Sequence, residues 1–549
     1  MKKTFLALYL SLTIGLLQAV NVTDSILSNT TWTASGSPYI IMDDIVIENN
    51  TTLTIEAGVE VKFDGNYQLV VDGELNINGT SSDWVVFTSN QTTPSSGDWG
   101  GIKFTSISDE DENSDIDYLD IQYVSTGISF SDHNYSTYLA DLDHIKISHF
   151  TDNGININNS IVSIQNIQIV NTGSNFQKGT GVRIVNNSNI GVPKIEGGSV
   201  KKCEKGIYIE NASPVIDGVD IESNASHGIT FNNDGAWGST RTVKIDNCMI
   251  RDNADGIRIY DRINETLNGE IAYNTIVNNR ANGINLYTSD YRYKGPEVSI
   301  HHNALYGNTE YQLYLGVYGT NSDIWINAEN NWWGTTDPSV INDSIYDHHD
   351  NNSGYVDFVP FLDSQDLEGG SSITNEYKLG PIDQNLSWTS DVLVVGDVVV
   401  ENDYTLSILS GVHVSMDERT GIVITDGNLQ VNGSNGDEVI FDSYQTTPSA
   451  GDWRGIEFTG LTPVSQSEMD YFTIEHAKNG LQFTANNAST VISNGTIKNF
   501  KNNGIHLENS DPLIKSVGII NTGSNFQKGT GIRIVNNSNI GVPKIEGGS

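Results

Sequence analysis

The chain has 549 residues, of which 37% are hydrophobic and 18% charged, with 53 Gly and only 12 Pro. This composition excludes a charge-rich disordered chain, a coiled coil and a collagen-like chain. Lys and Arg number 29 against 68 Asp and Glu, which gives a formal net charge of −39. Because a chain this acidic is repelled by a phosphate backbone, we expect no nucleic-acid partner.

The N-terminus predicts export. Two lysines follow Met1, a mostly apolar run extends over Phe5–Leu17, and Ala19 is a small residue at a suitable cleavage point. These are the parts of a bacterial-type secretory signal peptide over residues 1–19. No run is long enough to be a transmembrane segment. We therefore expect a secreted, extracellular or cell-surface protein.

A short phrase, Gly-Ile-x-apolar, recurs along the chain at spacings of 22 to 29 residues. Its copies begin at Gly127, Gly154, Gly181, Gly206, Gly228, Gly256 and Gly283, and a degenerate copy begins at Gln312. Each repeat holds two or three short alternating strands and no amphipathic helix, and one repeat alone cannot bury its apolar face. The pattern predicts an all-β right-handed parallel β-helix, a solenoid whose turns stack about 4.8 Å apart.

Asparagines stand at the expected corners, for example Asn224, Asn253 and Asn279. Asparagine tolerates the left-handed conformation, and its side chain can hydrogen-bond along a stack. Cys203 falls at the same corner and Cys248 at a different one. Since the two cysteines are about two turns apart, we expect two buried free thiols rather than a disulfide.

A longer sequence repeat, which spans many turns, is also present. Asn171 to Ser199 recurs as Asn521 to Ser549 with a single change, and Gln91 to Trp99 recurs in similar form as Gln445 to Trp453. We therefore expect a duplicated unit whose second copy is incomplete at its C-terminus. The predicted parts are the signal peptide at 1–19, a first β-helix unit at 20–362 with a closing segment at 330–362, a linker at 363–376 and a second unit at 377–549.

These repeats resemble those of secreted parallel β-helix proteins of the pectin-lyase-like superfamily. The segments that carry the resemblance are the Gly-Ile turns, the entry turns Thr52-Leu53-Thr54-Ile55 and Gly97-Asp98-Trp99, and the closing Asn331-Trp332-Trp333-Gly334. The resemblance implies the fold. It is weak for activity, because the superfamily includes lyases, hydrolases, epimerases and adhesins.

Extra residues follow the Gly-Ile strand in several consecutive repeats, where stacked insertions would form the wall of a groove. Aromatic and basic side chains gather there, although basic residues are scarce in this chain. Aromatic faces stack on sugar rings and Arg pairs with carboxylates or sulfates, so we interpret these residues as polysaccharide-binding. They are Tyr208, Trp237, Arg241, Arg258, Tyr260, Arg262, Tyr287, Tyr291, Arg292, Tyr293, Lys294 and Tyr314. The alternative is that they only cover the edges of the turns.

Catalysis in the same groove is a second hypothesis. A polysaccharide lyase needs a base and a group that neutralises the sugar carboxylate, and Arg251 and Arg258 are of the right type. A glycoside hydrolase needs two carboxylates, for which Asp255 and Asp261 are candidates. No catalytic motif of the family is present, and an acidic repeat protein offers such pairs by chance. Whether the protein is an enzyme stays open, with the non-catalytic interpretation favoured.

Two clusters invite a metal hypothesis. The carboxylates Asp109, Asp111, Asp115 and Asp117 suit Ca²⁺, although a solvated acidic loop is the favoured interpretation. We expect no other cofactor. Asp347-His348-His349-Asp350 lies in the closing segment, where we expect a loop rather than a metal site.

The leading hypothesis is a secreted or surface β-helix protein that binds extracellular polysaccharide in an adhesion or spacer role. A polysaccharide lyase or glycoside hydrolase that uses the same groove is the first alternative. A purely structural stalk is the second.

Overall fold

The computed structural model describes residues 19–105, 113–132, 139–171, 178–186, 191–234, 241–262, 267–288, 295–316, 324–351, 354–373, 377–459, 466–485, 489–522, 528–535 and 543–549. The predicted signal peptide lies outside these residues, except for Ala19. Tertiary contacts divide the chain into two compact units, unit 1 within residues 1–232 and unit 2 within residues 233–549. The boundaries predicted for the linker and the duplicated units stay predictions.

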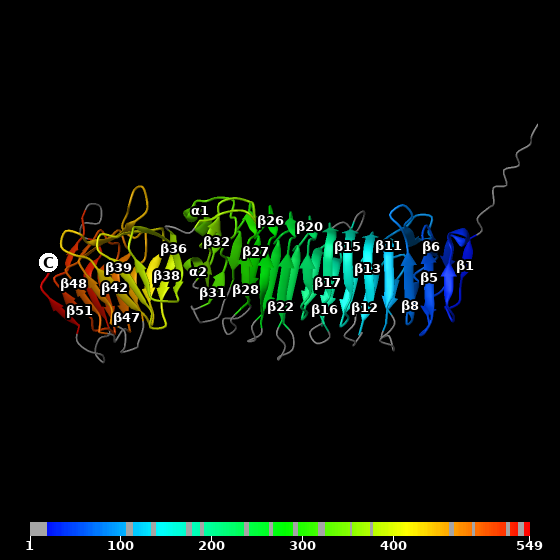
Figure 1. Cartoon of the computed structure of the whole chain (residues 1–549), viewed down its shortest axis with the longest axis horizontal. Helices are drawn as coiled ribbons and strands as arrows, with labels where there is room; N and C mark the ends of the chain where they lie inside the picture. Colours follow the sequence, from blue (N-terminus) through cyan, green and yellow to red (C-terminus); the bar gives the residue numbers. More distant parts are fainter. Residues whose placement is uncertain are drawn as a thin grey trace, which may run out of the picture. The chain divides into compact units, whose positions relative to one another are not determined.

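Unit 1 is built from parallel strands, each paired with strands one turn before and one turn after (Figure 1). The Gly-Ile phrases form one sheet, in which Ile128, Ile155, Val182 and Ile207 are register partners from turn to turn. Its strands are β4 (Ile45–Ile47), β7 (Gln68–Val71), β10 (Gly101–Phe104), β12 (Thr126–Ser131), β14 (Asn153–Asn158), β16 (Thr180–Val185) and β18 (Lys205–Glu210).

The other strands of unit 1 belong to a second sheet. They are β1 (Val20–Val22), β2 (Thr30–Trp32), β3 (Tyr39–Ile41), β5 (Thr52–Glu56), β6 (Glu60–Phe63), β8 (Glu74–Asn78), β9 (Val85–Ser89), β11 (Ser114–Gln122), β13 (Ala140–Ser148), β15 (Ser163–Val170), β17 (Lys194–Lys201), β19 (Val215–Asp217) and β20 (Asp220–Glu222). A short 3-10 helix, η1, covers Ala34–Gly36, and β21 (Ile229–Asn233) spans the division between the units.

Unit 2 begins with a first series of turns. The Gly-Ile strands of this series are β24 (Ile257–Asp261), β27 (Ile284–Tyr287) and β30 (Leu313–Leu315), followed in the same sheet by β32 (Ile345–Tyr346). The remaining elements are β22 (Thr242–Asp246), β23 (Met249–Arg251), β25 (Asn268–Ala272), β26 (Thr275–Val277), β28 (Glu297–His301), β29 (Ala304–Tyr306), β31 (Trp325–Asn327), α1 (Pro338–Asp343), α2 (His348–Asn351), β33 (Tyr355–Asp357), β34 (Phe361–Leu362) and β35 (Ser372–Ile373).

A second series of turns follows in unit 2. It starts with β36 (Tyr377–Ile382), β37 (Leu386–Trp388) and β38 (Val392–Val400), a strand that is buried along its whole length. One sheet continues through β40 (His413–Met416), β41 (Gly421–Ile424), β43 (Val439–Ser443), β44 (Gly455–Phe458), β46 (Phe472–Glu475), β47 (Asn479–Thr484), β49 (Thr496–Lys498), β50 (Asn503–Glu508), β52 (Gly518–Ile520) and β53 (Thr530–Val535). A 7-stranded sheet adds β39 (Thr405–Leu409), β42 (Asn428–Asn432), β45 (Glu468–Asp470), β48 (Val491–Ser493), β51 (Leu513–Lys515) and β54 (Lys544–Glu546) to β37.

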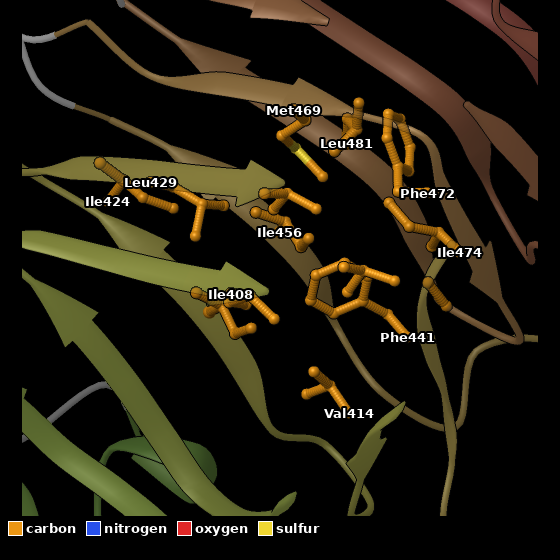
Figure 2. Close-up of a cluster of buried hydrophobic side chains, with 14 of the residues drawn as sticks. Ile408, Val414, Ile424, Leu429, Phe441, Ile456, Met469, Phe472, Ile474 and Leu481 are labelled. Atoms are coloured by element: carbon orange, nitrogen blue, oxygen red, sulfur yellow. The ribbon is translucent and has the colours of Figure 1, made fainter. Parts of the chain in front are cut away.

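Alternation along each strand builds the interior. In β24 the side chains of Ile257 and Ile259 are fully buried, whereas the intervening Arg258 is only partly covered. The second series has a continuous apolar core, in which residues such as Ile408, Phe441 and Ile456 come from different turns (Figure 2). The predicted all-β parallel solenoid is therefore confirmed.

Buried asparagines form hydrogen-bonded ladders in unit 2. The backbone amide of Asn253 donates to Oδ1 of Asn279 (3.0 Å), whose own amide donates to Oδ1 of Asn308 (2.9 Å). A second ladder runs from Asn274 through Asn303, with 2.9 Å between the amide of Asn274 and Oδ1 of Asn303. The expected bonding along the stack is confirmed. The expectation that these asparagines adopt the left-handed conformation is wrong.

The left-handed residue is the one before each ladder asparagine. Ser223, Asp252 and Asn278 have φ of 59°, 60° and 55°. The turn bends at this residue, which is exposed at Asp252 and Asn278 and half-buried at Ser223, and the next side chain points inward. A polar side chain at that inward position must be hydrogen-bonded to avoid the cost of a buried polar group. A corner thus combines a left-handed residue with a buried side chain.

Gly283 shows why the repeated phrase begins with glycine. A Cβ at this position would lie 2.6 Å from the carbonyl oxygen of Gln312 and 2.7 Å from Nδ2 of Asn308, on the next turn. Gly256 meets the carbonyl oxygen of Gly283 in the same way, at 2.6 Å. The glycine therefore allows the ladder asparagine and the neighbouring turn to approach the backbone.

Both cysteines are buried and free, as predicted. The amide of Cys203 donates to Oδ1 of Asn224 (3.0 Å), so Cys203 takes the place of a ladder asparagine in unit 1. Cys248 does the same in the second ladder, where its amide donates to Asn274 (2.9 Å). Burial raises the pKa of the Cys203 thiol to about 12. None of the helices in the described part of the chain is long and apolar enough to cross a membrane.

Candidate functional site

The outward side of the Gly-Ile sheet in unit 2 carries aromatic side chains on successive turns. Register pairs Tyr260 of β24 with Tyr287 of β27, and Tyr314 of β30 with Tyr346 of β32. Arg258 stands in the same row as Tyr314 because both pair with Asn285 of β27. We call this surface the tyrosine face; its members are Arg258, Tyr260, Tyr287, Tyr311, Tyr314 and Tyr346.

The rings of the tyrosine face contact one another. Tyr260 and Tyr287 have ring centroids 5.0 Å apart, and Tyr314 and Tyr346 stack at 4.6 Å with 12° between their planes. The guanidinium carbon of Arg258 lies 4.7 Å from the centroid of Tyr287, a cation–π contact. Burial raises the pKa of Tyr287, and the nearby Arg258 opposes that rise. Each ring is half-buried, so part of it stays available to a ligand.

Tyr311 and Tyr346 were not predicted. Tyr311 lies 5.1 Å from Tyr346, centroid to centroid, and 5.9 Å from Tyr314. Tyr346 belongs to the closing segment, which has no Gly-Ile phrase, so its place in the sheet shows only when β32 pairs with β30. The spacing of the repeat could not have placed it.

The two candidate hydrolase carboxylates are buried and bonded to the scaffold. Asp255 accepts hydrogen bonds through Oδ1 from the backbone amide of Asn282 (3.1 Å) and through Oδ2 from the side chain of Asn285 (3.1 Å). Asp261 ends β24 at an inward position and accepts from Nδ2 of Asn233 (2.8 Å). Asp255 is 5% exposed and Asp261 is 1% exposed, so both carboxylates are buried. Asp255 nevertheless contacts the outward row through Asn285.

The predicted basic residues are dispersed. Arg251 lies on β23, which belongs to the other sheet, and its guanidinium is 3.7 Å from Asp252. Arg241 is 2% exposed and precedes β22. Arg262 is exposed and forms an ion pair with Asp234 at 3.2 Å. Among the predicted arginines that lie in the described residues, Arg258 is the one that the structure brings to the tyrosine face.

Tyr208 lies in unit 1, on β18. Its hydroxyl donates to Glu210 (2.9 Å), and the ammonium of Lys205 is 4.6 Å from its ring centroid. The remaining predicted binding residues lie outside the described residues; they are Trp237, Tyr291, Arg292, Tyr293 and Lys294.

The predicted calcium ligands are only partly described, since Asp109 and Asp111 lie outside the described residues. Asp115 and Asp117 on β11 are the register partners of Asp141 and Asp143 on β13. Burial raises the pKa of Asp117, and the nearby Asp115 and Asp143 raise it further. The raised pKa reflects the repulsion between carboxylates on neighbouring turns, and it does not by itself indicate a metal site.

In the described part of the chain, Asp442, Glu475 and His476 bring ligand atoms of three residues within 4.8 Å of one another. Nδ1 of His476 is 2.6 Å from Oδ1 of Asp442. Glu475 is already paired with Lys498 at 2.6 Å. Because the ammonium group of Lys498 already pairs with Glu475, one of the three potential ligands, we assign no metal to this cluster.

Comparisons with solved structures give low similarity. An alginate lyase from Paenibacillus sp. str. FPU-7 has 13% identity and a TM-score of 0.30, over 62% of this chain and 99% of that one. The PL6 family alginate lyase AlyGC has 12% identity and a TM-score of 0.19, over 95% and 97%. The chain is also 26% identical over 144 residues to Protein bark beetle of Drosophila melanogaster, a match that covers 23% of this chain and 5% of that protein. None of the activities of these proteins is carried over to this chain.

Matches to known families agree with the geometry. Residues 24–117 match the family described as "Pectate-lyase like beta helix domain". Residues 126–309 match "Right handed beta helix region". The second match covers the parallel strands β12 to β27, whose register is described above. The chain belongs to the right-handed parallel β-helix proteins of the pectin-lyase-like superfamily.

Proposed function

We propose that this protein acts outside the cell and binds extracellular polysaccharide through the tyrosine face, without cleaving it. The observation that carries the proposal is the row of half-buried rings on successive turns, with Arg258 held over Tyr287 at 4.7 Å. Parallel stacking sets neighbouring turns about 4.8 Å apart. An extended polymer that follows the stack would therefore meet a ring or a guanidinium at each step.

The chemistry of the face suits sugar. Tyrosine offers an apolar ring for the C–H face of a pyranose and a hydroxyl for its polar edge. Arg258 adds a cation that can pair with a carboxylate or sulfate substituent. Its contact with Tyr287 restricts its rotamers before the ligand arrives, which lowers the entropic cost of binding.

The carboxylates support binding rather than hydrolysis. Asp255 and Asp261 are held by side-chain and backbone donors and are buried. A general acid or nucleophile must reach the glycosidic oxygen or the anomeric carbon. Two carboxylates engaged in the scaffold do not meet that requirement.

The experiment uses the full chain with a panel of acidic and neutral polysaccharides, with and without Ca²⁺. Size-exclusion chromatography follows both co-elution and polymer length. We expect co-elution with unshortened polymer, and at least tenfold weaker binding for Tyr287→Ala and Arg258→Ala. Tyr444→Ala is the control, because Tyr444 is 53% exposed and lies on the second series of turns.

Two outcomes contradict the proposal. Shortened polymer would assign a lyase or hydrolase activity to the protein. No co-elution with any polymer would favour the structural stalk. Equal binding by all variants would place the binding surface away from the tyrosine face.

A further inference from the structure

A cavity of about 380 Å³ in unit 2 is lined mainly by cations, although the whole chain carries a net charge of −39. The residues that line it are His348, Arg419, Gly451, Trp453, Arg454, Lys478 and Lys501. His348 belongs to α2 of the first series, and the others belong to the second series. This concentration of positive charge shares no residue with the tyrosine face, and none of the predicted site residues takes part in it.

Three of the cations form a ladder on consecutive turns. The amide that follows Lys478 donates to the carbonyl of Arg454 (3.1 Å), and the amide that follows Lys501 donates to the carbonyl of Lys478 (2.8 Å). These bonds place Arg454, Lys478 and Lys501 at the same corner of three stacked turns, about 4.8 Å apart. Like charges at such a spacing repel each other. The carboxylates of Asp397 and Glu457 offset this cost at Arg454, and an anionic ligand would offset it at the two lysines.

The corresponding turns of unit 1 show that the fold does not need these cations. Trp453 donates through Nε1 to the carbonyl of Glu475 (2.7 Å), and Trp99 donates in the same way to the carbonyl of Gln122 (2.8 Å). The serine–aspartate bond that closes each turn is also repeated, Ser443 to Asp452 and Ser89 to Asp98. The backbone arrangement is thus alike in the two places.

The corner side chains differ. Where the second series has Arg454, Lys478 and Lys501, the matching positions of unit 1 are Gly100, Ser125 and Thr151. Gly451 shares a positive φ with its counterpart Gly97, and a Cβ on Gly451 would lie 2.5 Å from Cδ of Lys501. One framework therefore carries a neutral corner in unit 1 and a cationic corner in unit 2.

Carboxylates orient the two arginines without closing the cavity. Nη2 of Arg454 is 2.8 Å from Oδ2 of the buried Asp397, and Arg419 is 3.2 Å from Asp350. Neither aspartate lines the cavity. Lys478 and Lys501 form no ion pair with a carboxylate among the residues that the structure describes. The arginines are thus held in place, and the two ammonium groups have charge to offer to a ligand.

An aromatic stack adjoins the cations. A second cavity, of about 280 Å³, shares His348 and Arg454 with the first. It is also lined by the rings of Trp325 and Tyr355 and by the carboxylates of Glu401 and Glu457. Trp325 stacks on Tyr355 with centroids 4.4 Å apart, and His348 stacks on Tyr355 at 4.1 Å. Trp325 is half-buried. Oxyanion-binding groups and an aromatic surface therefore lie side by side.

We propose that these two cavities form a binding site for an acidic saccharide. Its carboxylate or sulfate groups pair with Lys478, Lys501 and Arg454 on successive turns, and a sugar ring packs against the Trp325 stack. A ladder of cations selects a ligand with several regularly spaced anionic groups. The site and the tyrosine face share no residue, so either can fail without the other.

The test is calorimetric titration of the full chain with a purified oligogalacturonate. A neutral malto-oligosaccharide of equal length and sodium sulfate are the comparison ligands. The variant Lys478→Ser/Lys501→Thr installs the residues that unit 1 carries at the matching corners. The control Lys498→Ser/Lys515→Thr removes the same charge from β49 and β51.

We expect the oligogalacturonate to bind and the neutral sugar not to bind. The corner variant should weaken binding at least tenfold, because two charge-assisted contacts are lost, and the control should bind as the unmodified protein does. The difference in oligogalacturonate affinity between the corner variant and the unmodified corner should persist when Arg258→Ala and Tyr287→Ala are also present. That result separates this site from the tyrosine face. Unchanged thermal unfolding of the corner variant checks that it folds, and Lys501→Thr alone is the fallback.

Three results would overturn the proposal. The first is equal binding by the corner variant and the unmodified protein. The second is equal weakening by the control variant, which would indicate a long-range charge effect. The third is binding of sulfate as strong as that of the oligogalacturonate, which would assign the cavity to a free oxyanion.

Discussion

Replacing Asn279 by alanine tests whether the asparagine ladder holds the turns together. Asn279 is fully buried. Its Oδ1 accepts from the backbone amide (3.0 Å) and the side chain (3.2 Å) of Asn253, and its Nδ2 donates to the carbonyl of Ile250 (3.2 Å) and to Oδ1 of Asn308 (2.9 Å). Alanine removes all four contacts at once.

The expected loss follows from the groups that remain. The backbone amide of Asn253 is buried and loses its acceptor, which costs about 1–3 kcal/mol. The other contacts contribute less, because Asn308 still accepts from the backbone amide of residue 279 and the side chain of Asn253 still donates to Arg251 (3.0 Å). Together with the space left by the amide group, we expect a destabilisation of about 2–4 kcal/mol.

Native-state hydrogen exchange read by mass spectrometry is the suitable assay, because stacked turns need not unfold in one transition. We expect peptides over residues 250–285 to exchange faster in Asn279→Ala, by a factor that corresponds to that free energy. Asn432→Ala is the matched control, since Asn432 is exposed at the end of β42. If the two variants differ by less than about 0.5 kcal/mol, the ladder is not a source of stability and the reasoning fails.

Three further predictions concern single groups. Gly283→Ala should destabilise the protein by about 1–3 kcal/mol in urea denaturation, because its Cβ would overlap the next turn, whereas Gly531→Ala should be nearly neutral because its Cβ meets only one methyl at 3.9 Å. Burial, with the nearby Glu329, raises the pKa of Asp357 to about 7. The folded state therefore keeps a proton that the unfolded state releases near pH 4, so stability should fall as the pH rises from 4 to 7, and Asp357→Asn should remove that part of the fall in the urea midpoint. Cys203, buried and with its pKa raised to about 12, should not react with a thiol reagent at pH 8 until the protein is denatured; rapid native labelling would contradict its placement.

The fold could be predicted from the repeat because local and long-range requirements coincide in it. Glycine at the start of each phrase, alternating apolar residues and an asparagine at the corner are all needed by one turn and by its neighbour. Gly283 and Asn279 show this directly, since each contacts the turn that follows. Such residues therefore indicate stacking even in the sequence of a single turn.

The sites were harder to predict because they depend on register. The alternation of Ile257 and Ile259 already implies that the side chain of Asp261 points inward. Asp261 was nevertheless proposed as a hydrolase carboxylate on its charge alone. The cationic ladder could not be read in the same way. Its members stand at different distances from the next glycine, so only the hydrogen-bond register places Arg454 beside Lys478.

The closing segment illustrates a further limit. The segment that contains His348 was predicted to be a loop rather than a metal site. His348 instead begins the short helix α2 and stacks on Tyr355 at 4.1 Å. Arg419 and Arg454, which line the same cavity, follow about 70 and 105 residues later in the chain. A cavity assembled from segments without a common repeat leaves no periodic signal in the sequence.

The asparagine ladders also make the turns interchangeable. Oδ1 of Asn274 accepts a hydrogen bond from the backbone amide of Cys248 (2.9 Å). Oδ1 of Asn303 accepts one from the backbone amide of Asn274 at the same distance. A turn therefore presents the same acceptor to the preceding turn and the same donor to the following turn, whatever side chains it displays outward. Whole turns can be gained or lost during evolution without a new set of internal contacts, so the length of such a protein can adapt to its task while its interior stays the same.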